Sequence, residues 1–237
     1  MDVILVPGFW LDASSWDAVL PALREAGHRP HPMTLPGLES REANRSAITL
    51  RDHVDAVVAK VDACARPDPV VLVGHSGGGP VVHAAVDARP DKVARAVYVD
   101  AAPLNDGDPI NPELPAQGGE IPLPDWAFFD ERSLAGLDDE LRARFRAGAI
   151  PTPERVARDP VRLTDERRYQ VPVTIIACEV SSAEIRQMID SDNPYTREVA
   201  KLRHVDYIDL LTGHWPQFSR PDELGAALVS VANAAAG

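Results

Sequence analysis

This sequence has few cysteines, an excess of acidic over basic residues, and no long apolar run. Its 237 residues include 2 cysteines, and 24 Lys and Arg stand against 36 Asp and Glu, which gives a formal net charge of -12. Nucleic acids and anionic membranes bind clustered positive charge, so this balance argues against both as partners. A transmembrane helix needs about 20 consecutive apolar residues, and the sequence contains no such run.

The cysteines and the first residues bear on metal binding and on cellular location. Cys64 and Cys178 lie far apart and lack the Cys-x-x-Cys or Cys/His spacing of metal sites, so we expect reduced thiols and no structural metal. The apolar stretch 3–6 is too short for the core of a signal peptide, and no basic leader precedes it. We therefore expect a cytoplasmic protein that uses neither a metal nor a cofactor.

Short apolar stretches alternate with amphipathic ones along most of the chain. Such alternation predicts an α/β fold with a doubly wound, mainly parallel sheet, whose two faces are covered by helices. With 45% hydrophobic residues, a chain of this length can form one sizeable core. The expected strands are 3–6, 28–33, 70–73, 94–99, 173–177 and 205–210, and the expected helices of this pattern are 15–26, 49–63, 80–88 and 221–235.

Residues 103–170 interrupt this alternation. Their first part is crowded with Pro, Gly, Asn and Asp, and helices are expected only further on, at 137–147 and 153–161. The segment is too long for a connecting loop and too short for a self-sufficient domain, and its aromatic residues need an apolar partner. We therefore predict a small cap formed by 103–170 and inserted before the last two strands. The core would consist of 1–102 and 171–237.

The most specific motif lies between a short apolar strand and an Ala/Val-rich helix, where residues 74–78 read Gly-His-Ser-Gly-Gly. In this context Gly-x-Ser-x-Gly is typical of a nucleophile elbow, a sharp turn that exposes a reactive serine. Gly74 and Gly78 would let strand and helix approach closely, because a side chain at either position would clash. We predict that Ser76 is a catalytic nucleophile and that the backbone N–H of Gly77 faces a developing oxyanion.

A serine hydroxyl is a weak nucleophile near neutral pH and needs a base beside it. His214 follows the last expected strand and should lie at the carboxyl edge of the sheet, where the other histidines fit less well. The first expected strand leads to the same edge, where the N–H of Phe9 would complete an oxyanion hole with that of Gly77. The candidate walls of a substrate pocket are Trp10, Trp126, Phe128, Phe129 and Trp215.

Together these stretches resemble the α/β-hydrolase fold over nearly the whole chain. They are similar to the compact branch that contains plant methylesterases, hydroxynitrile lyases and small bacterial esterases. The order of serine before histidine also fits this fold, and the resemblance implies a triad of serine, histidine and an acid. The matching pieces are 7–10 (PGFW), 74–78 (GHSGG), 98–101 (YVDA), 172–176 (PVTII), and 213–214 (GH) followed by 220–221 (RP).

The chain departs from this family at two places. Pro7 stands where the family has histidine, although the backbone donors of the loop remain. Ser181 stands where the family's catalytic Asp is expected, and a histidine without a carboxylate loses control of its tautomer. Two residues could replace that Asp: Asp100, at the end of an expected strand, and Glu179, two positions before Ser181. Asp100 is preferred because some haloalkane dehalogenases of this fold carry their acid at that strand end. A site with no acid stays open.

These residues favour a serine hydrolase that cleaves a small, largely apolar ester or lactone through an acyl-enzyme. Two other functions stay open: a lyase or C–C bond hydrolase that uses the same serine and histidine, and a ligand-binding protein that has lost turnover because its acid is displaced. We expect a small-molecule substrate as the partner, and neither a nucleic acid nor a membrane. The oligomeric state stays open, with a homodimer among the alternatives.

Overall fold

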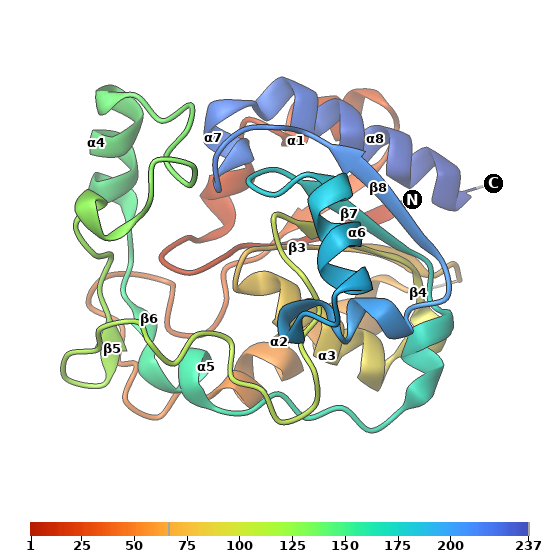
Figure 1. Ribbon diagram of the computed structural model, residues 1–237, viewed down its shortest axis with the longest axis horizontal. Coiled ribbons are helices and arrows are strands. Elements are labelled where there is room, and N and C mark those ends of the chain that lie inside the picture. Colours follow the sequence, from red (N-terminus) through yellow and green to blue (C-terminus); the bar gives the residue numbers. More distant parts are fainter. Residues whose placement is uncertain (66, 237) are drawn as a thin grey trace.

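The structure is a computed structural model that describes residues 1–65 and 67–236. Within these residues, six parallel strands form one sheet in the order β2-β1-β3-β4-β7-β8 (Figure 1). The doubly wound α/β fold predicted from the sequence is therefore confirmed. The strands are β1 (Asp2–Val6), β2 (Arg29–Pro32), β3 (Val70–His75), β4 (Val93–Val99), β7 (Val173–Ala177) and β8 (Val205–Asp209).

Helices cover both faces of this sheet. Alternate side chains of a strand point to opposite faces, so Ile4 and Leu72 share a hydrophobic cluster with α2 and α3, whereas Leu5 and Val73 share one with α1 and α8 (Figure 1). No described helix is long and apolar enough to cross a membrane. The helices are α1 (Leu20–Glu25), α2 (Leu50–Cys64), α3 (Gly78–Ala88), α4 (Asp139–Gly148), α5 (Glu154–Arg158), α6 (Ser182–Asp190), α7 (Pro216–Ser219) and α8 (Pro221–Ala236).

Most predicted elements lie within a few residues of the observed ones, and the exceptions include the predicted helix 15–26 and the two unpredicted helices α6 and α7. The predicted helix 15–26 is divided: a 3-10 turn, η1 (Ala13–Trp16), precedes α1, which begins at Leu20 because Pro21 favours the first turn of a helix. Helix α6 was not predicted. Ser181 caps its N-terminus: the Ser181 hydroxyl accepts from the N–H of Glu184 while the Glu184 carboxylate accepts from the N–H of Ser181, a reciprocal cap.

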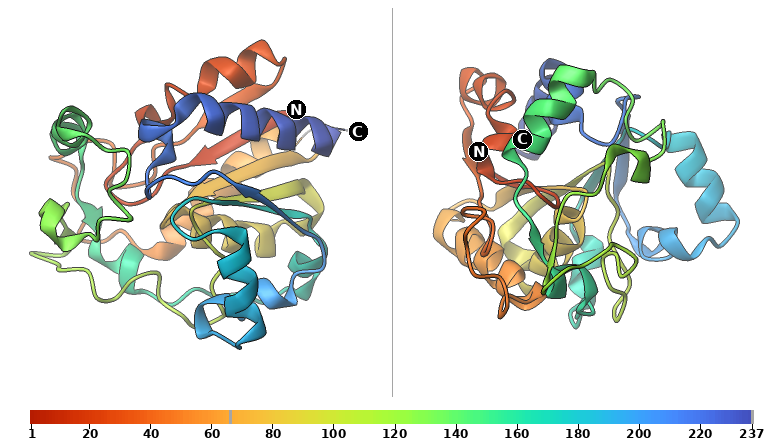
Figure 2. Two further views of the ribbon diagram at one scale, coloured as in Figure 1. Left: turned by 45° about the horizontal axis from the view of Figure 1, so that its top comes forward. Right: turned by 90° about the vertical axis from the view of Figure 1, so that its left-hand side faces the viewer.

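The segment between β4 and β7 lies at the end of the sheet where its strands end, and it faces the viewer in the right-hand panel of Figure 2. It holds α4, α5 and a small antiparallel sheet of β5 (Glu120–Ile121) and β6 (Thr152–Pro153). Its buried side chains, such as Leu114 and Phe145, belong to the same hydrophobic cluster as the α2 and α3 face of the main sheet. The segment is thus packed on the core, and its division at 103–170 stays a prediction.

Candidate active site

Ser76 lies at a sharp turn between β3 and α3. Its backbone φ is +49°, a left-handed conformation that residues other than glycine rarely adopt. Strand and helix come so close here that a Cβ at Gly74 would lie 2.7 Å from the carbonyl oxygen of Gly78, and a Cβ at Gly78 would lie 2.5 Å from that of Pro7. Both positions need glycine. The close approach fixes the turn and holds the Ser76 hydroxyl at the N-terminus of α3.

His214 is the side chain that reaches this serine. It lies in the loop between β8 and α7, and its Nε2 is 2.7 Å from Oγ of Ser76. The N–H of His214 donates to the carbonyl oxygen of Ser133 (2.8 Å), and the carbonyl oxygen of His214 accepts from Nε2 of His75 (2.7 Å). The imidazole is therefore held at hydrogen-bonding distance from Ser76 by contacts with the core and with the segment between β4 and β7.

Two carboxylates face the other nitrogen of the imidazole. Oδ2 of Asp100 lies 2.6 Å from Nδ1 of His214, and Oε2 of Glu179 lies 2.9 Å from the same atom. Asp100 ends β4 with φ at +42°, and its Oδ1 accepts from the backbone N–H groups of Cys178 (3.2 Å) and Glu179 (2.9 Å). Glu179 also accepts from the hydroxyl of Ser133. The two residues considered as alternative acids thus share one N–H.

Burial and hydrogen bonding have opposite effects on the pKa values of His214, Asp100 and Glu179. Burial lowers the pKa of His214, but the hydrogen bonds to Asp100 and Glu179 outweigh it and raise that pKa to about 9. Burial raises the pKa of Asp100. Burial also acts to raise the pKa of Glu179, but the hydrogen bond from His214 leads the opposing effects, which lower that pKa to about 2. Glu179 therefore keeps its charge more firmly than Asp100.

Two backbone N–H groups beside Ser76, those of Phe9 and Gly77, have no acceptor among the residues that the structure describes. The two residues are in close contact, because a Cβ at Gly77 would lie 2.6 Å from the Phe9 ring. Both also line the cavity that contains Ser76. Buried N–H groups are almost always paired, so two free donors next to a reactive hydroxyl suit a negatively charged oxygen.

The cavity over the serine has a volume of about 370 Å³. Trp10, Phe128 and Phe129 line it, as expected of pocket walls. Trp126 and Trp215 do not belong to its described lining, and their assignment as pocket walls stays a prediction. Trp215 is 1% exposed, and both indoles pack edge-on against each other and lie tilted or edge-on to Phe129. Large rings bury more surface against one another than against an open cavity.

Three residues around this group escaped the sequence analysis. Ser133 contacts both Glu179 and His214, and Gln217 donates from Nε2 to Nδ1 of His75 (3.2 Å), which in turn supports the His214 carbonyl group. No motif marks Ser133 or Gln217. A signal did exist for His75, because a buried polar side chain in an otherwise apolar strand requires a hydrogen-bond partner.

Asp100, Glu179 and His214 could also hold a metal ion, since one ligand atom from each lies within 4.8 Å of the others. The hydrogen bond to Ser76 argues for a proton instead. A metal on Nδ1 would force the imidazole hydrogen onto Nε2, which could then no longer accept the serine proton. A hydrogen on Nδ1, shared with the carboxylates, leaves Nε2 free to act as a base.

Comparison with known proteins gives evidence of the chain's family that is independent of this geometry. Residues 3–227 match a family model described as the alpha/beta hydrolase family. Methylesterase 3 of Arabidopsis thaliana is 25% identical over 259 residues, which cover 98% of this chain and 95% of that protein. Esterase PIR7B of rice (Oryza sativa subsp. japonica) is 34% identical over 136 residues, or 56% of this chain, and the match spans about half of the rice protein (47%).

Solved structures show the same architecture. An extracellular alpha/beta-hydrolase from a Paenibacillus species superposes with a TM-score of 0.77 at 20% identity, over 98% of this chain and 99% of the other. The Arabidopsis methylesterase MES16 superposes with a TM-score of 0.76 at 20% identity, with the same coverage. At these identities the likeness establishes the fold.

Proposed function

This chain belongs to the alpha/beta hydrolase family, and on that basis we propose that it is a serine hydrolase of small, largely apolar esters or lactones. Oγ of Ser76 attacks the carbonyl carbon while its proton passes to Nε2 of His214. The N–H groups of Phe9 and Gly77 bind the oxyanion. His214 then returns the proton to the leaving alcohol, and an acyl-enzyme remains. A water molecule, deprotonated by His214, releases the acid and restores the Ser76 hydroxyl.

The observation that carries this proposal is a continuous chain of hydrogen bonds that starts at Ser76, whose backbone conformation is strained. Ser76 contacts Nε2 of His214 at 2.7 Å, and Nδ1 of the same ring contacts Asp100 at 2.6 Å. In the neutral imidazole the carboxylate keeps hydrogen on Nδ1, so Nε2 presents a lone pair to the serine. A binding protein without turnover would have no need for a strained serine and two free N–H donors on one edge of the sheet.

The cavity over Ser76 supports a small, largely apolar substrate. Its volume of about 370 Å³ lies at the lower end of the range for small-molecule sites. Trp10, Leu104, Ile110, Phe128 and Phe129 give it largely apolar walls. The relatives named as esterases and methylesterases support an ester bond as the point of attack.

The test combines a covalent probe with a chromogenic ester. We expect a fluorophosphonate probe to add one adduct to the protein, located on Ser76 by peptide mass spectrometry, and p-nitrophenyl butyrate to be hydrolysed. Ser76→Ala should lose both signals, and His214→Ala should lose hydrolysis. The matched control is Ser230→Ala, at an exposed position of α8.

An intact protein with neither adduct nor hydrolysis would refute the proposal. If cleavage persists in Ser76→Ala, Ser76 is not the nucleophile. Mass spectrometry of protein quenched during turnover should find the butyryl group on Ser76. A lyase that uses the same residues only as a proton relay would carry no acyl group.

A further inference from the structure

A side cavity lies at the carboxyl end of β7, beside α6. Its walls include Ile175 of β7, Ile185 and Met188 of α6, and Val199 further along the chain. Its volume is about 220 Å³, whereas sites that hold a whole small molecule begin at about 300 Å³. The side cavity therefore has room for one group of a larger ligand rather than for a ligand of its own.

Five residues line both the side cavity and the cavity over the serine. Two of them, Ala101 and Ala102, present only methyl groups, and a third, Tyr195, is 75% exposed and stands at the rim. The other two are Asp100 and Glu179, the carboxylates that face the imidazole. The two cavities therefore adjoin next to the reacting groups, and the barrier between them is lowest at the two alanines.

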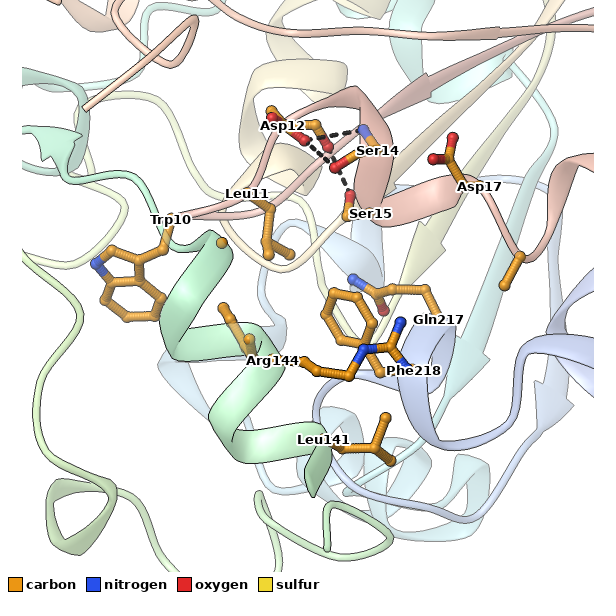
Figure 3. Close-up of a pocket in the computed structure, with 13 residues that line it drawn as sticks. Trp10, Leu11, Asp12, Ser14, Ser15, Asp17, Leu141, Arg144, Gln217 and Phe218 are labelled. Atoms are coloured by element: carbon orange, nitrogen blue, oxygen red, sulfur yellow. Dashed lines mark hydrogen bonds between the residues drawn. The ribbon is translucent and has the colours of Figure 1, made fainter. Parts of the chain in front are cut away.

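A third cavity, between η1, α4 and α7, is separated from the substrate in a way that the side cavity is not (Figure 3). Among the described lining residues it shares only Trp10 with the cavity over the serine. The indole N–H of Trp10 donates to the carbonyl oxygen of Ile121 (3.1 Å), which holds this wall in place. The third cavity is also lined by the charged groups of Asp12, Asp17 and Arg144 (Figure 3). The side cavity is therefore the better extension for an apolar substrate.

The polar side chains of the side cavity are already engaged within the protein. The carboxylates of Asp100 and Glu179 contact His214, and Asp100 also accepts from two backbone N–H groups. The hydroxyl of Thr196 donates to a backbone carbonyl oxygen (3.1 Å). Apart from these groups and the exposed Tyr195, the lining side chains are aliphatic or carry the thioether of a methionine. Such walls suit a hydrocarbon chain, which needs no hydrogen bond.

The strand order determines which part of an ester extends toward the side cavity. Strand β3, which leads to Ser76, lies between β1 and β4 in the sheet. Phe9 follows β1 and would hold the carbonyl oxygen on that side, whereas Asp100 and Glu179 follow β4 and β7 on the other side. The leaving oxygen must lie within hydrogen-bonding reach of Nε2 of His214, whose ring contacts these carboxylates. The alcohol part of the ester is therefore the part directed toward the side cavity.

We propose that the side cavity binds the alcohol part of the substrate, an unbranched alkyl chain of medium length, and that Ile185 and Met188 determine this specificity. The inference rests on the serine hydrolase function proposed above. The ester carbonyl group stays at Ser76, and the alkyl chain passes over Ala101 and Ala102 into the side cavity. The preferred substrates are then esters of longer primary alcohols, since the single carbon of a methyl ester leaves the side cavity unused.

The test compares two isomers, hexyl acetate and ethyl hexanoate, which contain the same atoms and carry the long chain on opposite sides of the ester bond. The full-length protein is given each ester, and release of the acid is followed with a pH indicator. Each buried methylene group strengthens binding about fourfold. We therefore expect kcat/KM for hexyl acetate to exceed that for ethyl hexanoate by at least about tenfold.

Substitutions on one helix locate the effect. Met188→Trp places an indole at the wall of the side cavity and should abolish the preference for hexyl acetate, whereas Gln187→Trp adds the same group to α6 at an exposed position and should keep it. Met188→Ala widens the side cavity, so octyl acetate should gain relative to hexyl acetate. Thermal melts check that each variant folds.

Binding of the alkyl chain can also be measured without hydrolysis. The protein contains three methionines, Met1, Met33 and Met188, and of these Met188 alone lines the side cavity. The expected product, 1-hexanol, is titrated into protein that carries ¹³C-labelled methionine methyl groups, and the signals are followed by NMR. We expect the Met188 signal to shift and to saturate at millimolar hexanol, while the signals of Met1 and Met33 stay unchanged.

Three results would overturn the inference. The first is equal kcat/KM for the two isomers or a preference for ethyl hexanoate, which leaves the proposed hydrolase function intact. The second is a preference that survives Met188→Trp or is lost equally in Gln187→Trp. The third is hexanol that leaves the Met188 signal unmoved. A protein that cleaves neither ester would refute the proposed function instead, and the hexanol titration alone would then decide whether the side cavity takes an alkyl chain.

Discussion

The two carboxylates beside His214 can be removed one at a time and then together. We expect the single variants to show that Glu179 partly replaces Asp100. The changes are Asp100→Asn, Glu179→Gln and the double variant, each of which keeps the size of the side chain. Asp100 makes the shorter contact with Nδ1, 2.6 Å against 2.9 Å, and is anchored by two backbone N–H groups. Its loss should therefore cost more than the loss of Glu179.

The expected loss of kcat in each variant depends on which carboxylate remains beside His214. In a triad with one acid, the Asp-to-Asn change lowers kcat by about 10⁴-fold because the imidazole adopts the wrong tautomer. Here Glu179 can still accept from Nδ1, so we expect Asp100→Asn to lower kcat by about 10²-fold and Glu179→Gln by about fivefold. The double variant should reach about 10⁴-fold. The excess over the product of the single effects corresponds to a coupling of about 2 kcal/mol.

The assay is steady-state hydrolysis of p-nitrophenyl butyrate by the four proteins, with urea unfolding as the control for folding. If the double variant is no slower than Asp100→Asn, Glu179 takes no part. If Glu179→Gln is the more damaging single change, the acid is Glu179 and the preference for Asp100 is wrong. Full activity in all three variants would mean that His214 needs no carboxylate.

The pH profile provides a second readout of the same variants. The base acts only when neutral, and the carboxylates raise the pKa of His214 to about 9, so kcat/KM of the wild type should rise with pH up to about that value. Each substitution removes one group that stabilises the imidazolium, so the rise should move to lower pH in both single variants. An unchanged profile would contradict the contacts described for Nδ1.

Two further changes test the rest of the site. Gly77→Ala would bring a methyl group to 2.6 Å from the Phe9 ring, which must push the Phe9 loop away. We expect kcat to fall by about 10²-fold with KM little changed, as for the loss of one oxyanion donor, and wild-type kcat would argue against the Phe9 and Gly77 donors. His75→Phe leaves the carbonyl oxygen of His214 and the amide of Gln217 without partners, so urea unfolding should show a loss of about 2 kcal/mol. An unchanged midpoint would show that neither hydrogen bond contributes.

The central strands β1, β3 and β7 were predictable from the sequence because nearly all their residues are buried and they read as almost continuous apolar runs. The serine turn was predictable for a related reason. Gly74 is required by its contact with Gly78, one turn further along the chain, and the two glycines leave a fixed spacing in the sequence. Features set by close neighbours in the chain leave patterns of this kind.

The arrangement of the acids could not be read in the same way. Whether Asp100 or Glu179 reaches His214 depends on side-chain lengths and on two neighbouring strand ends, and the structure brings both to one nitrogen. Ser181, which stands at the family's usual acid position, is used to begin α6. For Trp126 and Trp215 a contact with the substrate stays a prediction, because the sequence does not show which way an aromatic ring near a pocket faces.

The hydrogen bonds between the segment that joins β4 to β7 and the loop that carries His214 limit how this protein could be re-engineered. The N–H of Gly213 donates to the carbonyl oxygen of Ala135 (3.1 Å), the N–H of His214 donates to that of Ser133 (2.8 Å), and a Cβ at Gly213 would lie 2.4 Å from the Ala135 oxygen. Residues 133–135 and 213–214 therefore form a matched pair. A chimaera that received the segment between β4 and β7 from another member of the family would keep the turn at Ser76, yet lose the contacts that hold the imidazole. This segment and the loop of His214 must be exchanged together.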